Sequence, residues 1–298
     1  MNEYNVYVRS NKTIKTMSLT RLTFLIPIFL YSLYKNIVIY NNIINSIVIL
    51  LGSIFIGVMV NYIYETFVKK SNKSFIDKVF SSFHLEYAIL SACVTSIYVN
   101  LIVYFIVLFG ILFASKFIKT IINQIALIFI LVYIISIFTG GFTYLSSSID
   151  LAQLDYNDYL LGTNPGGVFA TGIVFTLIAF IGMNVTNNIK GIITISATVS
   201  FIILAVFGIL LFNQDIYTML FGYNYFFIFS FIANEFVTSS YTKKGMIIYG
   251  VAIGIITFIL YFINRILAPY IAIEMISLLN IFIDKKMNYL ENKRKGLV

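Results

Sequence analysis

The sequence predicts an all-α polytopic membrane protein with about ten transmembrane helices in two inverted five-helix halves. Of its 298 residues, 60% are hydrophobic and only 11% are charged, whereas a soluble domain carries roughly 25% charged residues. Several apolar runs reach the roughly 18 residues that indicate a membrane helix. The basic residues also fall almost entirely on one side of these runs, as the positive-inside rule requires.

Ten apolar segments support this fold class. They are Leu19–Tyr34, Ile44–Tyr64, Leu85–Val99, Leu101–Ala114, Ile125–Phe138, Gly166–Met183, Ile192–Phe212, Met219–Phe236, Met246–Ile263 and Pro269–Ile283. The third, fourth, fifth and tenth segments are shorter than the roughly 20 residues of a full span. We therefore expect some of these helices to be tilted, broken or re-entrant.

The charge distribution predicts the orientation. With the N-terminus inside, 18 of the 20 Lys and Arg residues lie on the inner side, and only Lys35 and Arg265 lie outside. This asymmetry marks the inner side as the cytoplasm. We expect a multi-pass protein of the cell (plasma) membrane with both termini in the cytoplasm.

The same pattern divides a single membrane domain, residues 19–298, into two halves. Residues 19–138 and 166–283 hold five segments each, and the acidic outer loop 139–165 joins them. Residues 1–18 are then a cytoplasmic N-terminal segment, and 284–298 a cytoplasmic tail. Because five is an odd number, similar halves have opposite topology, which is typical of transporters with a site near the middle of the membrane.

The sequence also excludes several kinds of function. It contains no G-x-x-x-x-G-K-[ST] phosphate loop, so we expect no ATP hydrolysis by this chain. A single cysteine, Cys93, and a single histidine, His84, exclude a disulfide framework and a multi-histidine metal site. The basic residues lie in connectors between spans. We therefore expect the lipid bilayer, and no nucleic acid, as a partner, and we expect no metal and no catalytic residue.

Polar residues interrupt the end of the eighth segment. Asn234 and Glu235 follow an aromatic run, and hydroxyl side chains are concentrated in residues 238–242. An ionised carboxylate deep in the bilayer costs several kcal/mol unless it is paired or hydrated. Glu235 is therefore either an interfacial residue paired with Lys243 or Lys244, or part of a broken helix that lines a polar cavity, where non-helical backbone is tolerated.

Two further polar clusters accompany this one. Glu86, Tyr87 and Ser91 lie near the start of the third segment, and Tyr223 and Asn224 lie near the outer end of the eighth. Both clusters have a structural explanation, because tyrosines are common at membrane interfaces and a loop end is solvated. The alternative is that they line the same cavity as Glu235.

Glu274 is the most isolated carboxylate, inside the tenth segment among apolar neighbours. Such residues face the protein interior, so Glu274 is either a neutral hydrogen-bonding group or a proton-coupling site. Asn123 and Gln124 open the fifth segment, where they could cap the helix or line the cavity.

The eighth segment resembles the NqrB/RnfD family, the membrane subunits of sodium-pumping NADH:quinone and Rnf-type ferredoxin oxidoreductases. Asn234-Glu235-Phe236-Val237-Thr238 stands where that family has Thr-Asp-Pro-Val-Thr, and Gly245 follows at the family's spacing. Ile283-Asp284 matches the end of a family span. Ser10-Asn11-Lys12, Ala88-Ile89-Leu90-Ser91-Ala92 and Gly166-Gly167 extend the resemblance more loosely over nearly the whole chain.

The chain departs from the family pattern in the outer loop. The family attaches FMN to the threonine of a Ser-Gly-Ala-Thr-like motif there, and the nearest match is Ala170-Thr171, preceded by Val168-Phe169 instead of Ser-Gly. Thr171 is therefore only a weak candidate for covalent FMN. The resemblance still implies non-covalent riboflavin or FMN, as a substrate or a bound flavin.

Three functions follow from this comparison. The first is riboflavin uptake by a stand-alone flavin transporter that is not an enzyme. The second is the role of an RnfD-like membrane subunit in an Rnf/Nqr-type ion-translocating electron transport complex, an oxidoreductase that needs partner subunits. The third is a scaffold or a transporter of another solute. The residues expected to contact the flavin are Tyr223, Asn224, Phe227, Asn234, Glu235, Thr238, Glu86, Tyr87 and Ser91, with Glu274 as a possible coupling residue.

Overall fold

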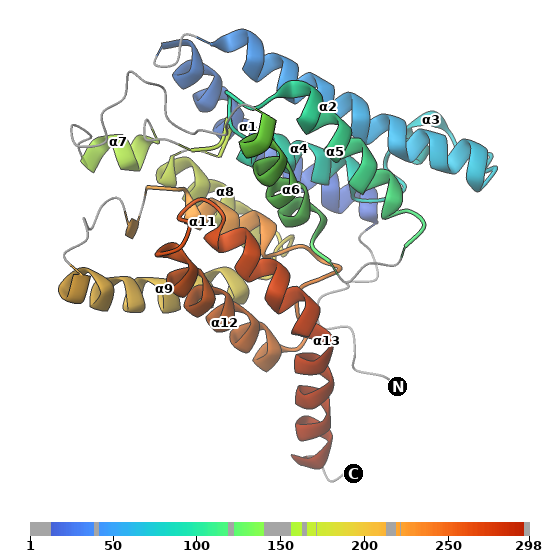
Figure 1. The fold of residues 1–298 in the computed structure, drawn as a ribbon. Coiled ribbons are helices and arrows are strands. Elements are labelled where there is room, and N and C mark those ends of the chain that lie inside the picture. Colours follow the sequence, from blue (N-terminus) through green and yellow to red (C-terminus); the bar gives the residue numbers. More distant parts are fainter. Residues whose placement is uncertain are drawn as a thin grey trace.

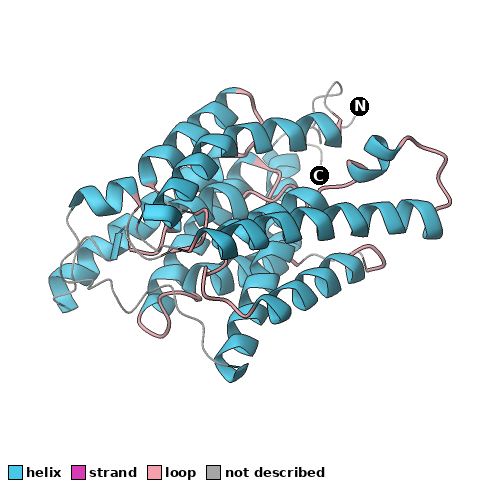
Figure 2. Cartoon of the chain, turned by 90° about the horizontal axis from the view of Figure 1, so that it is seen from above, coloured by secondary structure: helices cyan, strands magenta, loops and turns pink. Residues whose placement is uncertain are grey.

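The computed structural model describes residues 13–38, 42–118, 122–139, 156–162, 166–170, 172–212, 219–220 and 222–294. These residues form helices and loops, with no strand among them (Figure 2). The helices are α1 Ile14–Val38, α2 Ile43–Ile63 with its π-helical continuation η1 Tyr64–Val68, α3 Phe75–Val79, α4 His84–Val94, α5 Leu101–Ala114, α6 Gln124–Thr139, α7 Tyr156–Leu161, α8 Ile173–Val185, α9 Gly191–Phe212, α11 Tyr225–Phe227 with its π-helical continuation η3 Ile228–Ile232, α12 Lys243–Tyr261 and α13 Ala268–Arg294.

Helix length and surface polarity agree with a polytopic membrane protein. Within the described residues, four stretches are long and apolar enough to cross a membrane: α1, α2 with η1, residues 191–208 of α9, and α12. In the same part of the chain four other apolar helices are shorter: α4, α5 and α6, which were expected to be short, and α8, which was not. Large apolar side chains point outward, with Phe138 84% and Leu210 75% exposed. Exposing such apolar side chains to water is unfavourable, whereas exposing them to lipid is not.

The helices pack in the same order in the two parts of the chain. In the first part, α2 contacts α4 and α5, and α5 contacts α6; in the second, α9 contacts η3 and α12, and α12 contacts α13. Figure 1 shows α9, α12 and α13 side by side. Between the parts, α1 contacts α8, α4 contacts η3, and α6 contacts α13. The first, third and fifth segments of one half therefore contact the first, third and fifth segments of the other half, as expected of two similar halves.

Small residues bring α9 and α12 unusually close together. A Cβ atom added at Gly250 would lie 2.0 Å from Ser196 Oγ, and one added at Gly254 would lie 2.0 Å from Ser200 Oγ. Small residues four apart allow this approach, and van der Waals packing then holds the two helices together in lipid.

Some expected boundaries were wrong. The sixth helix begins at Ile173 instead of Gly166, because residues 166–170 are non-helical and donate backbone hydrogen bonds to the end of α4 and the residue after it. Gly167 permits this contact, since an added Cβ would meet Cys93 O at 2.3 Å. The tenth helix, expected to end at Ile283, continues to Arg294 and projects from the body of the molecule (Figure 1).

Candidate functional site

The eighth segment is a broken helix, which is one of the two alternatives that the sequence left open. Its helical part ends at Ile232, and residues 233–242 are non-helical before α12 begins. Asn234 holds this break together with four hydrogen bonds. Its Oδ1 accepts from the Lys190 backbone N at 3.1 Å, and its Nδ2 donates to Thr194 Oγ1 at 2.6 Å and to the carbonyls of Phe229 and Ser230. Asn234 therefore acts first as a structural cap of the broken helix.

Hydroxyl side chains satisfy the backbone that the break leaves without helical partners. Ser239 Oγ donates to the carbonyl of Glu235, and Thr242 Oγ1 accepts from Gly245 N at 3.0 Å as the N-cap of α12. Asp284 on α13 accepts from Ser240 Oγ at 2.5 Å. Ser239 and Thr242 thus bind freed backbone groups, whereas Ser240 binds the Asp284 carboxylate.

The third segment breaks in the same way. α4 ends at Val94, and the chain stays non-helical until α5 begins at Leu101. The stretch 166–170 covers this end, since Val168 N donates to Thr95 O at 2.8 Å and Phe169 N donates to Cys93 O at 3.0 Å. The two broken segments, α4 and η3, contact each other within the molecule.

A buried ion pair lies beside both broken segments. Arg21 Nη1 on α1 lies 2.8 Å from Glu86 Oε1 on α4, and the two side chains are 1% and 0% exposed. Arg21 Nη2 also donates to the carbonyl of Phe231 on η3 at 3.3 Å. One guanidinium thus connects α1, α4 and η3. By charge pattern alone Arg21 is one of the inner-side basic residues, but its position as a lone arginine within an apolar segment is also a signal of a functional residue.

Glu235 lies near this ion pair, because the ring of the next residue, Phe236, packs against the Arg21 guanidinium. It is 1% exposed, and its Oε2 accepts from Thr238 Oγ1 at 2.8 Å. The expected alternative, a pair with Lys243 or Lys244, is wrong: both lysines are exposed at the start of α12 and neither forms an ion pair with Glu235. Tyr87 Oη and Glu235 Oε1 are both buried, and neither forms a hydrogen bond within the described residues.

Aromatic rings enclose these polar groups. Phe83 stacks on Tyr87 with ring centroids 6.2 Å apart and on Phe236 with centroids 5.8 Å apart. The Arg21 guanidinium lies 5.2 Å from the centroid of the Phe236 ring. A cation over an aromatic face is attracted by the ring quadrupole. The cluster therefore combines charge, hydrogen-bonding capacity and planar apolar surface.

The remaining predicted residues lie elsewhere. Tyr223 and Asn224 precede η3 at its opposite end, where Asn224 adopts φ +54°. Phe227 stacks on Phe231 at 4.6 Å, and Ser91 Oγ donates to the Tyr87 carbonyl of its own helix at 2.7 Å. The structure thus brings together Glu86, Tyr87, Glu235 and Thr238, while the Tyr223–Asn224 pair stays apart. Thr171 lies outside the described residues.

Glu274 joins α13 to α6. Its Oε2 accepts from Asn123 N at 3.2 Å. Asn123 Oδ1 in turn accepts from Ala126 N at 3.1 Å, and its Nδ2 donates to Ile232 O on η3 at 2.8 Å. Asn123 therefore caps α6, which is one of its two expected roles, and ties this cap to the broken helix.

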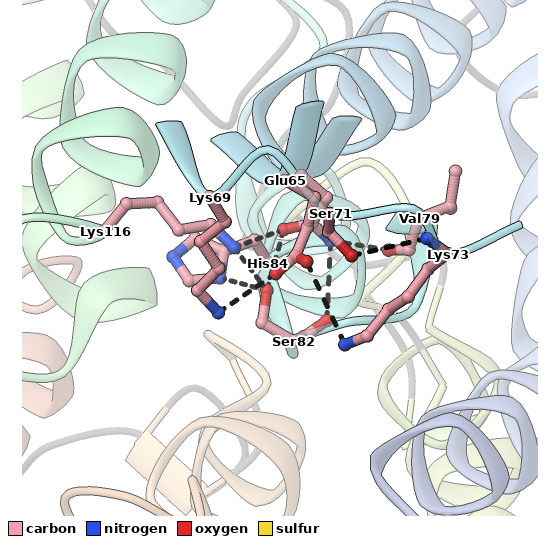
Figure 3. A network of polar contacts seen from close by, with 9 residues as sticks. Glu65, Lys69, Ser71, Lys73, Val79, Ser82, His84 and Lys116 are labelled. Atoms are coloured by element: carbon pink, nitrogen blue, oxygen red, sulfur yellow. Dashed lines mark hydrogen bonds and ion pairs between the residues drawn. The ribbon is translucent and has the colours of Figure 1, made fainter. Parts of the chain in front are cut away.

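A second polar network lies at the end of α2 (Figure 3). The sequence did not predict it. Lys116 Nζ donates to Asn61 Oδ1 and Ser82 Oγ, both at 2.6 Å. Ser82 Oγ lies 2.9 Å from His84 Nδ1, and His84 Nε2 lies 2.8 Å from Ser115 Oγ. Burial lowers the pKa of Lys116 to about 8. The network fastens the α5–α6 connector to α2.

Glu65 supplies the negative charge of this network. Its side chain is 2% exposed, and it pairs with Lys69 at 3.1 Å and with Lys73 at 3.9 Å (Figure 3). The described residues contain no group of three or more His, Cys, Asp or Glu side chains that could hold a metal ion. The network is therefore built from amides, hydroxyls and ion pairs.

The comparisons with known proteins agree with this architecture. A sequence model of the NQR2, RnfD, RnfE family matches residues 1–288. No curated protein matches the chain. The family match covers both broken segments and the ion pair between α1 and α4.

Proposed function

Because this chain belongs to the NQR2, RnfD, RnfE family, we propose that it binds a flavin between its two sets of five segments and carries riboflavin across the membrane. The observation that carries the proposal is the meeting of two broken segments at a buried polar cluster enclosed by aromatic rings. Discontinuous helices at the interface of two repeats are the usual place for a transported solute.

The chemistry of the cluster suits riboflavin as a substrate. The isoalloxazine ring is planar, and the rings of Phe83, Tyr87 and Phe236 offer stacking surfaces. Glu235 Oε1 and Ser230 Oγ are buried and receive or donate no hydrogen bond among the residues described. They can pair with the polar edge of the ring or with the ribityl hydroxyls.

The contacts between the segments suggest how access is controlled. The Arg21–Phe231 hydrogen bond is long, at 3.3 Å, whereas the Arg21–Glu86 pair is short, at 2.8 Å. Rocking of one half against the other would break the weaker link first. Arg21 would stay with Glu86 while η3 moves away, and the cluster would open toward the side that the basic residues mark as the cytoplasm.

A redox role is the alternative, because family members include subunits of Rnf- and Nqr-type complexes. In that case the chain would be an RnfD-like membrane subunit of an ion-translocating oxidoreductase, with partner subunits. The two functions differ in how the flavin is held. A transporter releases its substrate, whereas a redox subunit with covalent FMN retains it.

The test uses the full chain purified in detergent. Its absorbance spectrum is recorded, and the protein is then denatured and precipitated. Flavin in the supernatant, together with riboflavin uptake into proteoliposomes, supports transport; flavin retained on the polypeptide supports the redox role. Glu235→Gln should reduce the bound flavin, whereas Gly110→Ala, with no atom within 4 Å of the added Cβ, should not. Absence of any flavin affinity would overturn both functions.

A further inference from the structure

The hairpin formed by η1, α3 and the residues between them carries a group of lysines that the proposed transport does not use. They are Lys69, Lys70, Lys73 and Lys78. Only two acidic residues, Glu65 and Asp77, lie in the same stretch, residues 64–78, so the hairpin is net positive. The charge pattern places it on the cytoplasmic side, and α3 lies at one edge of the molecule (Figure 1).

Buried Glu65 holds two of these lysines in place. Its carboxylate lies 3.1 Å from Lys69 Nζ and 3.9 Å from Lys73 Nζ, while both lysine side chains are more than half exposed. An ammonium group has three N–H donors. One buried carboxylate therefore leaves donors on both lysines for an anion at the surface.

Contacts with the end of α2 give the hairpin a defined shape. Lys78 Nζ donates to Thr66 Oγ1 at 3.2 Å, and the rings of Tyr62 and Phe75 contact each other with centroids 5.6 Å apart. These contacts join the two arms of the hairpin. The lysines between the arms are therefore carried by a folded element.

Lys70 occupies a backbone position that favours other residues. Its φ is +49°, in the left-handed region, and the other two non-glycine residues with positive φ in the described chain are asparagines. Asparagine and glycine tolerate this conformation better than lysine does. The turn ends η1, where Ser71 N donates to Glu65 O at 2.9 Å. Because strain of this kind concentrates at functional sites, it indicates that the exposed Lys70 side chain has a function of its own.

Large apolar side chains are exposed beside the lysines. Phe67 is 69% and Phe75 is 60% exposed. The Lys69 ammonium lies 5.4 Å from the centroid of the Tyr64 ring. The apolar stretch Ile43–Val68 ends within the hairpin, so cationic and apolar groups adjoin where this span reaches the cytoplasmic interface. Such a combination suits the boundary between lipid head groups and acyl chains.

We propose that the η1–α3 hairpin binds an anionic phospholipid of the inner leaflet. The lipid phosphate accepts hydrogen bonds from Lys69, Lys70 and Lys73, and an acyl chain lies against Phe67 and the lipid-facing side of α2. A zwitterionic lipid brings a cation of its own, so the lysines favour a head group with net negative charge. The positive-inside rule explains orientation but predicts no retained lipid. The proposal does not rest on flavin transport.

The test is native mass spectrometry of the purified full chain with dioleoyl phosphatidylglycerol and dioleoyl phosphatidylcholine, which have identical acyl chains. The wild-type chain should retain phosphatidylglycerol saturably and at lower concentrations than phosphatidylcholine, and higher ionic strength should weaken this binding. Lys70→Gly/Lys73→Gln should weaken phosphatidylglycerol binding by about 25-fold, because each lysine near an anionic lipid surface contributes about fivefold. Glu65 keeps its closer partner, Lys69, in this variant.

Lys243→Gln/Lys244→Gln is the matched control. It removes two exposed lysines from the same side of the membrane, at the start of α12, and should bind phosphatidylglycerol like the wild type. Lys70→Gly alone separates lipid binding from folding. It should keep or raise the thermal midpoint, because glycine adopts positive φ readily, and still weaken phosphatidylglycerol binding by about fivefold.

Three outcomes would overturn the site. They are equal affinity of the wild type for the two lipids, an equal loss of phosphatidylglycerol binding in the hairpin variant and the control, and unchanged binding in Phe67→Ser, which removes only an apolar contact. Binding of polyglutamate that depends on the hairpin lysines, without selectivity between the lipids, would assign the surface to an acidic protein instead. Lipid retention is measured without riboflavin, so failure of transport would leave this result unaffected.

Discussion

The guanidinium of Arg21 lies 2.8 Å from the carboxylate of Glu86, and neither side chain is more than 1% exposed. Removing one member of such a pair leaves an uncompensated buried charge, which costs about 3–5 kcal/mol. We expect Arg21→Met to lower the thermal midpoint of the detergent-purified protein sharply. Glu86→Leu should have a similar effect.

The double variant Arg21→Met/Glu86→Leu separates charge burial from packing. Replacing both members of a buried pair by apolar residues is often neutral or stabilising, so we expect it to recover most of the lost stability. If the double variant is as unstable as the sum of the two single variants, the pair does not act as a unit. Flavin content, measured on the same samples, should stay low in all three.

Asn234 should be the residue on which the broken helix depends most. Asn234→Ala removes four hydrogen bonds, and at roughly 1 kcal/mol net for each we expect a loss of about 2–4 kcal/mol. Thr194→Val removes one of these partners and should cost about 1 kcal/mol. Thermal melts of the two variants test this order, and equal effects would contradict it.

Gly254 and Gly110 provide a matched pair for helix packing. Ala at Gly254 would place a Cβ 2.0 Å from Ser200 Oγ and 2.5 Å from Ala197 O, so α9 and α12 must separate. We expect a loss of about 1–3 kcal/mol, as for other overpacked sites. Gly110→Ala meets no atom within 4 Å and should be neutral or slightly stabilising through helix propensity. Equal melting temperatures for the two variants would argue against close packing.

The lowered pKa of Lys116 predicts that the stability of the protein depends on pH above neutrality. Burial lowers its pKa in the folded protein to about 8 from the usual 10.5. Below pH 8 the lysine is charged in both states, and the folded state bears the cost of burying that charge. Between pH 8 and 10.5 only the unfolded state stays charged and binds the extra proton, so this residue's contribution to stability should rise with pH. Lys116→Met should flatten that part of the profile of thermal midpoint against pH; an unchanged profile would contradict the assignment.

The sequence by itself determined the elements of this protein. The apolar runs showed where the larger helices form, because each of the ten predicted segments contains helical residues. For example, α12 begins within three residues of the expected Met246. The polar run after Ile232 made a broken helix one of two alternatives, because polar side chains can bind freed backbone groups. Ser239 Oγ does so at the Glu235 carbonyl, and Asn234 Nδ2 does so at the Phe229 and Ser230 carbonyls. These bonds connect residues that are near one another in the chain, whereas the bonds of Asn234 to Lys190 N and Thr194 Oγ1 join residues that only packing brings together.

Only the tertiary structure decided which polar groups meet. Arg21 on α1 and Glu86 on α4 are separated in the chain by α2 and α3, yet they form a buried ion pair. Asn280 on α13 likewise reaches Thr238 across α12. The boundary at Gly166 was wrong for the same reason, because residues 166–170 form hydrogen bonds with the distant α4 instead of with themselves. Periodicity shows which segments are apolar, but buried charges and freed backbone groups are satisfied by partners from other helices, and those partners are set by packing.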